Sequence, residues 1–197
     1  IQVAEALQSI HAIGVIHRDL SAQNVLIEAG REPRVKVIDF TGCLLTDRFF
    51  GLRDEPRPEG DLEVTRDRAL HTLPFAAPEV RADRRWSERS DVFALGVLLY
   101  RLLTGKMPFT AQARDRYIRL PANHPGQGVD PVLEAMLRSN PAERLPDMRA
   151  VAERLRDVLE EEGAGDETPP ARPQLALVTI SDANSTEAPA ANLDIDP

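Results

Sequence analysis

Apolar positions at the start of the chain repeat with the period of a helix. Val3, Leu7 and Ile10 lie three or four residues apart, which places them on one face of an α-helix. Gly14 follows four residues after the last of them, and glycine is a common C-terminal helix cap. The pattern therefore predicts a helix that ends just before Gly14.

Short β-branched runs follow this helix and predict strands. They occupy residues 15–16, 25–27 and 35–38, and polar or turn residues separate them. Pro33 lies in the turn between the last two runs. Residues 40–73 show no sustained period and are rich in charged residues, Pro and Gly, which is typical of a long functional or disordered loop.

Helical patterns return in the second half of the chain. Residues 90–104 are strongly apolar and are followed by Gly105, and shorter helical patterns cover 131–137 and 148–159. Small hairpins followed by several helices predict a mainly α fold. Strands and helices do not alternate, so the pattern does not predict a parallel sheet.

Charge divides the 197-residue chain into two parts. Residues 160–197 hold nine acidic residues and one basic residue, so this segment carries the whole formal net charge of −8. The segment is also rich in Pro and Ala and has no aromatic residue. Such a composition buries too little apolar surface to fold. We therefore expect a folded domain at 1–161 and an acidic, Pro/Ala-rich, disordered tail at 162–197.

The composition also excludes several classes of protein. A single cysteine, Cys43, rules out a disulfide framework and a cysteine-rich zinc site. No apolar run is long enough to span a membrane, so we expect no membrane partner and a cytoplasmic location. A net acidic chain is a poor candidate for nucleic-acid binding. The excess of 22 arginines over two lysines, with abundant alanine, favours a bacterial source.

Three polar residues flank the predicted short strands. Asp19 and Asn24 precede residues 25–27, and Asp39 follows 35–38, so their side chains can converge at the strand ends. Two carboxylates and an amide make an oxygen-rich site that suits Mg²⁺, which binds one or two protein carboxylates together with phosphate oxygens. A carboxylate that does not bind the metal can accept a hydroxyl proton. Phosphoryl transfer needs little more from the protein than such positioning and charge neutralisation.

The residues around these positions resemble the motifs of eukaryotic-type protein kinases. Matching motifs occur in the family order along the chain, at His17-Arg18-Asp19-Leu20 with Asn24, Asp39-Phe40, Thr72, Ala77-Pro78-Glu79, Ser90-Asp91-Val92 with Gly96, and Asn140-Pro141-Ala142-Glu143-Arg144. Together they make the chain similar to the large lobe of a Ser/Thr protein kinase. The expected fold is a mainly α kinase-like large lobe with short β-hairpins at the catalytic cleft.

The resemblance implies a role for each matching residue. Asp19, Asn24 and Asp39 form the expected catalytic set, with Asp19 as the catalytic base. Asn24 and Asp39 are expected to hold Mg²⁺ and, with Leu26 under the adenine ring, to bind ATP. The substrate is expected to be a protein.

Other matching residues are expected to hold the fold rather than to react. Glu79 and Arg144 should form a buried structural ion pair. Asp91 should accept hydrogen bonds from the backbone of the catalytic loop, and His17 should brace that loop.

The chain departs from the kinase pattern at three points. Thr41 replaces the Gly expected after Asp-Phe, and Ser21 replaces a Lys that Ser/Thr kinases usually carry. The chain also has no Gly-rich phosphate loop, and neither Lys36 nor Lys106 precedes the catalytic loop. We therefore expect the small lobe to be absent from this chain and the chain alone to be inactive.

Two other functions compete with a Ser/Thr protein kinase. A pseudokinase, or a kinase-lobe scaffold or binding module without catalysis, is favoured by Thr41 and Ser21 but opposed by the retained Asp19, Asn24 and Asp39. A small-molecule phosphotransferase would share the Asp-to-Asn spacing, but the resemblance ranks it lower because such enzymes lack the Ala-Pro-Glu motif.

Overall fold

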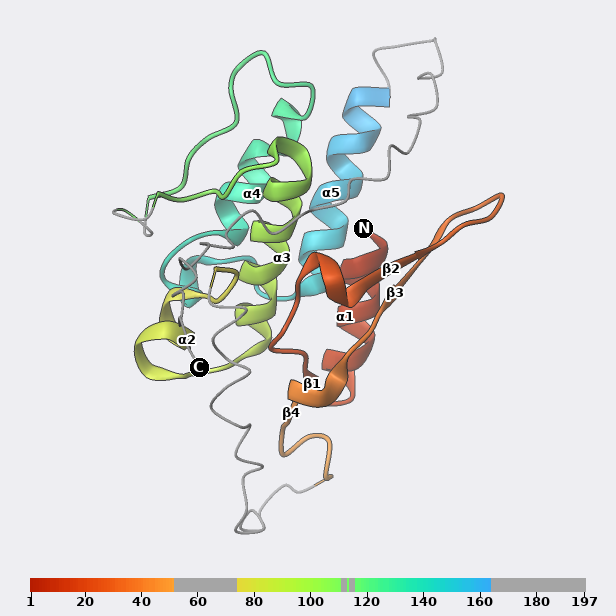
Figure 1. Cartoon of the computed structure of the whole chain (residues 1–197), viewed down its shortest axis with the longest axis vertical. Coiled ribbons are helices and arrows are strands. Elements are labelled where there is room, and N and C mark those ends of the chain that lie inside the picture. The colour runs from red at the N-terminus through yellow and green to blue at the C-terminus, as the bar shows by residue number, and fades with distance from the viewer. Residues whose placement is uncertain (52–73, 111–112, 114–115, 164–197) are drawn as a thin grey trace, which may run out of the picture. The chain divides into compact units, whose positions relative to one another are not determined.

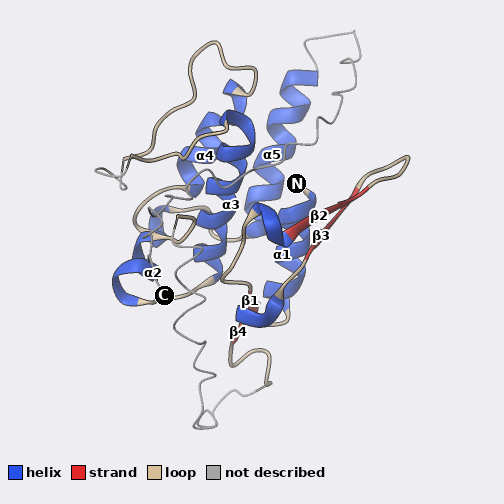
Figure 2. Cartoon of the chain, viewed as in Figure 1, coloured by secondary structure: helices blue, strands red, loops and turns tan. Residues whose placement is uncertain are grey.

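The computed structural model describes residues 1–51, 74–110, 113 and 116–163 (Figure 1). The chain divides into two units, 1–165 and 166–197, and all described residues lie in the first. Its helices are α1 (Gln2–Ala12), α2 (Pro78–Asp83), α3 (Glu88–Thr104), α4 (Asp130–Met136) and α5 (Met148–Gly163). Its strands are β1 (Val15–Ile16), β2 (Val25–Glu28), β3 (Arg34–Val37) and β4 (Leu44–Leu45). The described part is therefore mainly helical with short strands, as predicted (Figure 2).

The core forms around α3. Its residues from Ser90 to Leu98 are all buried, and α3 packs against α4 and α5, while α5 also packs against α1 (Figure 1). At Gly96 a β-carbon would lie 3.0 Å from side-chain atoms of Met136 and Leu137. Helix α4 and its end therefore approach the backbone of α3 closely, and glycine is the residue that permits this approach.

The strands form two antiparallel pairs. In the longer pair, Leu26 of β2 lies opposite Lys36 of β3, and β3 packs against α1 while the turn of the hairpin projects outward (Figure 1). In the shorter pair, Ile16 of β1 lies opposite Leu44 of β4. Strand β4 was missed in the sequence because two adjacent leucines have no alternation, and only the pairing with β1 makes them a strand.

Helix α5 runs to Gly163, two residues past the predicted domain boundary at residue 161. The rest of the predicted tail, 164–197, lies outside the described residues. No helix in the described ranges is long and apolar enough to cross a bilayer.

Gly14 lies at a tight turn between α1 and β1. It has a positive φ of 85° and its N–H donates to the carbonyl of His11 over 2.9 Å, so it caps α1 as predicted. A β-carbon at this position would lie 2.5 Å from the backbone nitrogen of Phe49 and 2.6 Å from Oγ1 of Thr46. The segment that follows β4 therefore packs directly on the turn. Glycine is required at this position for two reasons: its backbone adopts a positive φ, and there is no room for a side chain.

Substituting Gly14→Ala is expected to lower the free energy of unfolding by about 2–4 kcal/mol, because a left-handed alanine is strained and its methyl group meets backbone. Urea denaturation measures this change. The matched control is Gly30→Ala, where the added carbon would meet nothing closer than 3.6 Å. The control should change stability by less than about 1 kcal/mol. Equal stability of the two variants would contradict the packing of Thr46 and Phe49 on this turn.

Asp130 ties the segment before α4 to the start of that helix. The side chain is 1% exposed, and its Oδ1 accepts hydrogen bonds from the hydroxyl of Tyr117 at 2.7 Å and from the backbone of Leu120 at 2.8 Å. Burial raises the pKa of the Tyr117 hydroxyl, and the hydrogen bond to Asp130 raises this pKa further. Burial, and then the charge of Asp130, also raise the pKa of the Tyr100 hydroxyl.

The two tyrosines of the chain should therefore stay protonated in the folded state at a pH where free tyrosine ionises, near 10. Because both folded-state pKa values lie above the unfolded value, their contribution to stability is fully present below about pH 10 and is lost as pH rises through the folded-state values. Tyrosinate absorbance, followed with helix content across an alkaline titration, tests this. Tyrosinate that forms near pH 10 while the helices remain intact would contradict it.

Candidate active site

The polar residues singled out in the sequence lie at one end of the β2–β3 hairpin. Asn24 is the last residue of the 3₁₀ turn Ala22–Asn24 and directly precedes β2, while Asp39 comes two residues after β3 ends. The N–H of Ile38 donates to the carbonyl of Asn24 over 2.9 Å and continues the hydrogen bonding past both strands. Antiparallel pairing thus brings Asn24 and Asp39 to the same end of the hairpin.

The amide of Asn24 holds Asp19 in place. Its Nδ2 donates to the backbone carbonyl of Asp19 at 2.7 Å and to Oδ2 of the Asp19 carboxylate at 3.2 Å. The other carboxylate oxygen, Oδ1, is buried and has no hydrogen-bond partner within the described structure. A buried oxygen without a partner costs about 1–3 kcal/mol. Such an atom calls for an explanation, and acceptance of a proton or of a ligand is one.

Asp39 has a left-handed backbone, with φ 60° and ψ 74°. It is the N-cap of the 3₁₀ turn Phe40–Gly42, and its Oδ1 accepts hydrogen bonds from the N–H of Thr41, at 3.3 Å, and from the Thr41 hydroxyl. Short polar residues tolerate this backbone better than most. Asp39 is exposed, and the two hydrogen bonds from Thr41 restrain the orientation of its carboxylate.

Asp91, at the start of α3, fixes the backbone that leads to Asp19. The carboxylate is 1% exposed and accepts from the N–H of His17 at 2.8 Å and from the N–H of Arg18 at 3.0 Å. Its Oδ2 also lies 2.8 Å from Nε2 of His11 in α1. The predicted hydrogen bonds from Asp91 to the catalytic-loop backbone are present. The contribution of His11 was missed, because a lone histidine in an amphipathic helix gives no signal of its partner.

His17 joins the two halves of the site. The side chain is fully buried, its Nε2 lies 3.0 Å from the carbonyl of Ile38, and its ring packs edge-on against Phe40 with centroids 5.0 Å apart. It therefore links the loop that holds Asp19 to the segment that holds Asp39. This is the bracing role expected from the sequence, and His17 does not face the carboxylates as a reactive group.

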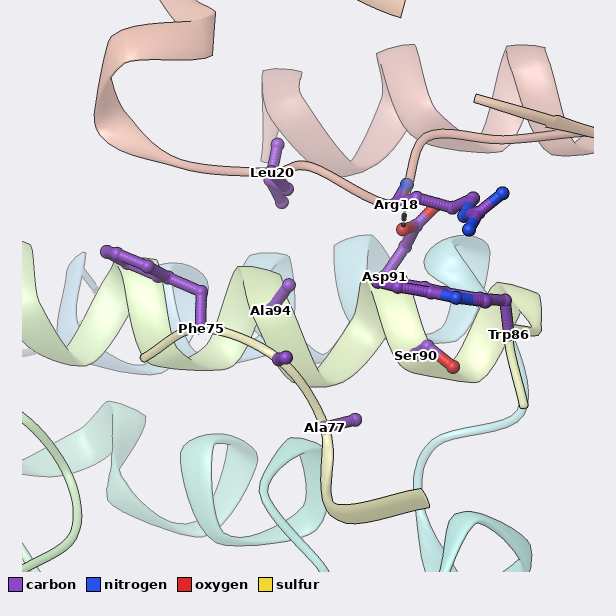
Figure 3. Close-up of a pocket in the computed structure, with 9 residues that line it drawn as sticks. Arg18, Leu20, Phe75, Ala77, Trp86, Ser90, Asp91 and Ala94 are labelled. Atoms are coloured by element: carbon purple, nitrogen blue, oxygen red, sulfur yellow. Dashed lines mark hydrogen bonds between the residues drawn. The ribbon is translucent and has the colours of Figure 1, made fainter. Parts of the chain in front are cut away.

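A small cavity lies between the loop that holds Asp19, helix α3 and the segment before α2 (Figure 3). Its volume is about 10 Å³, close to the lower limit for one water molecule. At the rim of the cavity, the Arg18 guanidinium lies 4.7 Å above the centre of the Trp86 ring. The cavity is a packing defect beside a cation–π contact and is too small for a substrate.

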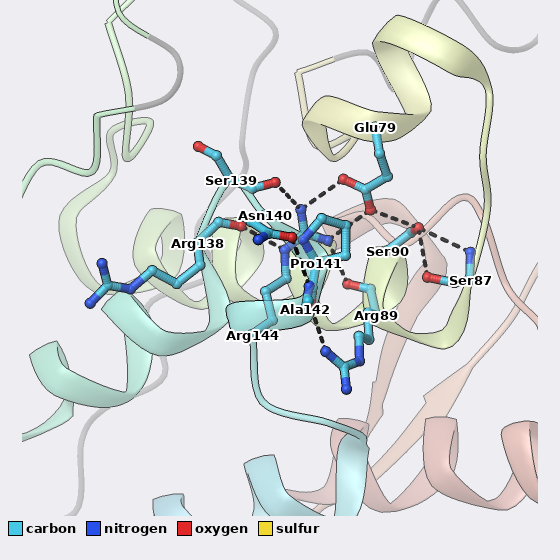
Figure 4. Close-up of polar contacts among 10 residues, drawn as sticks. All are labelled: Glu79, Ser87, Arg89, Ser90, Arg138, Ser139, Asn140, Pro141, Ala142 and Arg144. Atoms are coloured by element: carbon cyan, nitrogen blue, oxygen red, sulfur yellow. Dashed lines mark hydrogen bonds and ion pairs between the residues drawn. The ribbon is translucent and has the colours of Figure 1, made fainter.

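Arg144 and Glu79 form a bidentate ion pair, as the sequence predicted (Figure 4). Both guanidinium–carboxylate bonds are 2.7 Å long, and the Arg144 side chain is completely buried. The remaining donors of Arg144 reach the backbone carbonyls of residues 89, 138 and 139, and Ser90 donates to Glu79. This network connects α2, α3 and the loop after α4.

A comparison of the sequence with known protein families identifies the family of this chain. The family model of the protein kinase domain matches residues 1–155. The chain belongs to the protein kinase family. Thr72, one of the positions that matched kinase motifs, lies outside the described residues.

Several Ser/Thr protein kinases are similar to this kinase domain. Pkn1 of Myxococcus xanthus is 36% identical over 143 residues, which cover 69% of this chain and 19% of the relative. PknJ of Mycobacterium tuberculosis is 43% identical over 115 residues (57% and 17%), and PkaA of Streptomyces coelicolor is 33% identical over 168 residues (81% and 28%). The chain thus spans less than a third of the length of each of these relatives.

Ser21, where the kinase pattern has a lysine, can be placed in the structure, and so can the nearby lysine Lys36. Ser21 is 8% exposed and its carbonyl accepts from the N–H of Asn24 at 3.1 Å, so it closes the turn that carries Asn24. Lys36 forms an exposed ion pair with Glu28 in the hairpin, at 3.1 Å. Glu28 lies at the turn end of the hairpin, so this pair directs the Lys36 side chain away from the Asn24 end.

Leu26, the residue expected under the adenine ring, lies on an uncovered part of the hairpin. Its side chain is 50% exposed, and that of its neighbour Ile27 is 58% exposed. Neighbouring residues on a strand point to opposite faces, so the hairpin presents apolar side chains on both faces. The adenine contact of Leu26 stays a prediction.

The donors present suit Mg²⁺ better than metals that need a full protein cage. No cluster of three or more His, Cys, Asp or Glu side chains that could hold a metal occurs within the described ranges. Mg²⁺ needs only one or two protein oxygens because phosphates and water supply its other ligands. Asn24 and Asp39 provide such oxygens. Since Nδ2 of Asn24 is engaged with Asp19, its amide oxygen Oδ1 is the atom left for a cation.

Proposed function

We propose that this chain is the large lobe of a protein kinase domain that transfers the γ-phosphate of ATP to Ser or Thr of a protein substrate. The observation that carries the proposal is the Asn24 amide, which holds both the backbone carbonyl and the carboxylate of Asp19. Family membership supports the same reaction. Asp19, Asn24 and Asp39 are its proposed catalytic residues.

In this proposal Asp19 acts as the base, while Asn24 and Asp39 act as metal ligands. Asp19 accepts the proton of the attacking hydroxyl on its carboxylate, which the Asn24 amide holds by a hydrogen bond to Oδ2. The amide oxygen of Asn24 and the carboxylate of Asp39 would hold Mg²⁺, which would supply charge neutralisation of the phosphates. Asp91 and His17 keep these groups in place before substrate binds, which reduces the reorganisation needed during the reaction.

The exposed apolar residues of the hairpin support the large-lobe part of the proposal. Leu26 and Ile27 on the two faces of the hairpin, and Phe40 in the turn that follows it, are each 40–58% exposed. Exposed apolar side chains that lie near one another in the fold favour a covering partner. We propose that the adenine ring and the small lobe of the kinase domain cover them.

The second candidate function is a kinase-lobe scaffold without catalysis. Ser21 favours it, because the missing cation weakens stabilisation of the transferred phosphate. The arrangement of Asp19 and Asn24 favours catalysis, since a scaffold has no need of a carboxylate that an amide holds in one orientation.

One experiment separates the two functions. The product of the complete gene is incubated with γ-labelled ATP, Mg²⁺ and a basic acceptor protein, and the labelled residues are identified after acid hydrolysis. A kinase places label on Ser or Thr, and removal of Mg²⁺ by a chelator abolishes it. A folded protein that transfers no label with or without Mg²⁺ would favour the scaffold.

A further inference from the structure

We propose that Thr41 is a positioning residue for the Asp39 carboxylate. The inference rests on the proposed function, in which Asp39 binds Mg²⁺. The family pattern has glycine after Asp-Phe, and glycine has no side-chain donor. Here the Thr41 hydroxyl and the Thr41 N–H both donate to Oδ1 of Asp39. The departure from the family pattern thus adds a hydrogen bond to the proposed metal ligand.

The backbone on the N-terminal side of Asp39 is already fixed by other groups. The N–H of Ile38 donates a hydrogen bond to the carbonyl of Asn24 over 2.9 Å, and the carbonyl of Ile38 lies 3.0 Å from Nε2 of His17. Asp39 itself has a left-handed backbone, which persists only where its surroundings impose it. The two donors of Thr41 act on the carboxylate itself, and they add a restraint on its rotation.

Such a restraint has a direct consequence for metal binding. A carboxylate oxygen has about two acceptor sites, and Oδ1 of Asp39 receives two donors from Thr41. These donors leave less of Oδ1 to a metal, and coordination by a single carboxylate oxygen suits the octahedral geometry of Mg²⁺. Groups that orient a metal ligand in this way typically change metal affinity by about 10–100-fold.

Competition between Thr41 and the metal would have the opposite effect, and the test distinguishes the two. If the Thr41 hydroxyl competes with the cation for Oδ1, its removal would tighten metal binding. The two effects have opposite signs, so one titration separates them.

The test uses Mn²⁺ alone as a paramagnetic probe of the 197-residue chain. Mn²⁺ broadens the amide NMR signals of residues near its site, and the signals of Asn24 and Asp39 report the concentration at which it binds. The spectrum also shows whether each variant is folded. The variants are Thr41→Val, Thr41→Ser and Asp39→Asn. Thr46→Val is the control, because the Thr46 hydroxyl donates to the carbonyl of Gly14, in the turn after α1.

We expect Thr41→Val to need about tenfold more Mn²⁺ than the native chain. Thr41→Ser should restore native binding because it keeps the hydroxyl, and Thr46→Val should bind as the native chain does. Asp39→Asn should lose the site. Native or tighter binding by Thr41→Val, with binding lost in Asp39→Asn, would overturn the role of Thr41 and leave the metal site standing. Native binding by Asp39→Asn would overturn both this inference and the metal assignment in the proposed function.

Discussion

Replacing Asp19 with asparagine in the complete gene product is expected to lower kcat for phosphate transfer by about 10²–10⁴-fold. Asparagine has nearly the same shape and can keep an oxygen opposite the Asn24 amide, so the loop should stay folded. It cannot accept a proton from the attacking hydroxyl. The KM for ATP should change by less than about threefold, because Asp19 is not a proposed ligand of the nucleotide. Steady-state transfer of labelled phosphate measures both constants.

Asp83→Asn is the charge-matched control for this substitution. Asp83 is exposed at the end of α2, and its removal should leave kcat unchanged. If Asp19→Asn kept native kcat, or if it raised the KM for ATP while kcat was preserved, Asp19 would not be the base.

Replacing Arg144 with alanine is expected to lower the free energy of unfolding by about 3–5 kcal/mol. The substitution leaves the Glu79 carboxylate in a largely buried place, 14% exposed, without its cation. It also removes the donors to three backbone carbonyls and the contact of the guanidinium with the Phe93 ring, 4.9 Å away. Urea denaturation followed by the fluorescence of Trp86, the only tryptophan of the chain, measures the change.

Two comparisons separate the ion pair from simple truncation. Arg149→Ala removes an exposed pair with Glu153, and such pairs contribute little, so no measurable loss is expected. In a double-mutant cycle, Glu79→Ala combined with Arg144→Ala should destabilise by clearly less than the sum of the two single changes. Strict additivity would show that the two side chains do not act as a pair.

The regular elements of the fold could be predicted because their residues carry the signal themselves. The apolar period placed α3 and α5, and the β-branched runs placed β2 and β3 to within one or two residues. Strand β4 could not be predicted, since its existence depends on pairing with β1. The short helix α2 was also missed, because six residues are too few to show a helical period.

The candidate site could be predicted as a set of residues but not as a geometry. Motif spacing identified Asp19, Asn24 and Asp39, and it also indicated the Glu79–Arg144 pair. The bond from Asn24 to one particular oxygen of Asp19 depends on side-chain rotation. The same holds for the contact of Thr41 with Asp39. In the sequence Thr41 was interpreted only as a missing glycine, because a pattern records the backbone that a residue replaces and not the hydrogen bond that it adds.

The most direct test of the account is the rate of phosphate transfer by the complete gene product carrying Asp39→Ala, measured as a function of Mg²⁺ concentration. If Asp39 is a ligand of the metal that neutralises the phosphates, transfer should fall by at least about 100-fold. A higher Mg²⁺ concentration should recover part of this loss, because the Asn24 oxygen remains. Undiminished transfer by Asp39→Ala at every Mg²⁺ concentration would contradict the metal assignment and the proposed site with it.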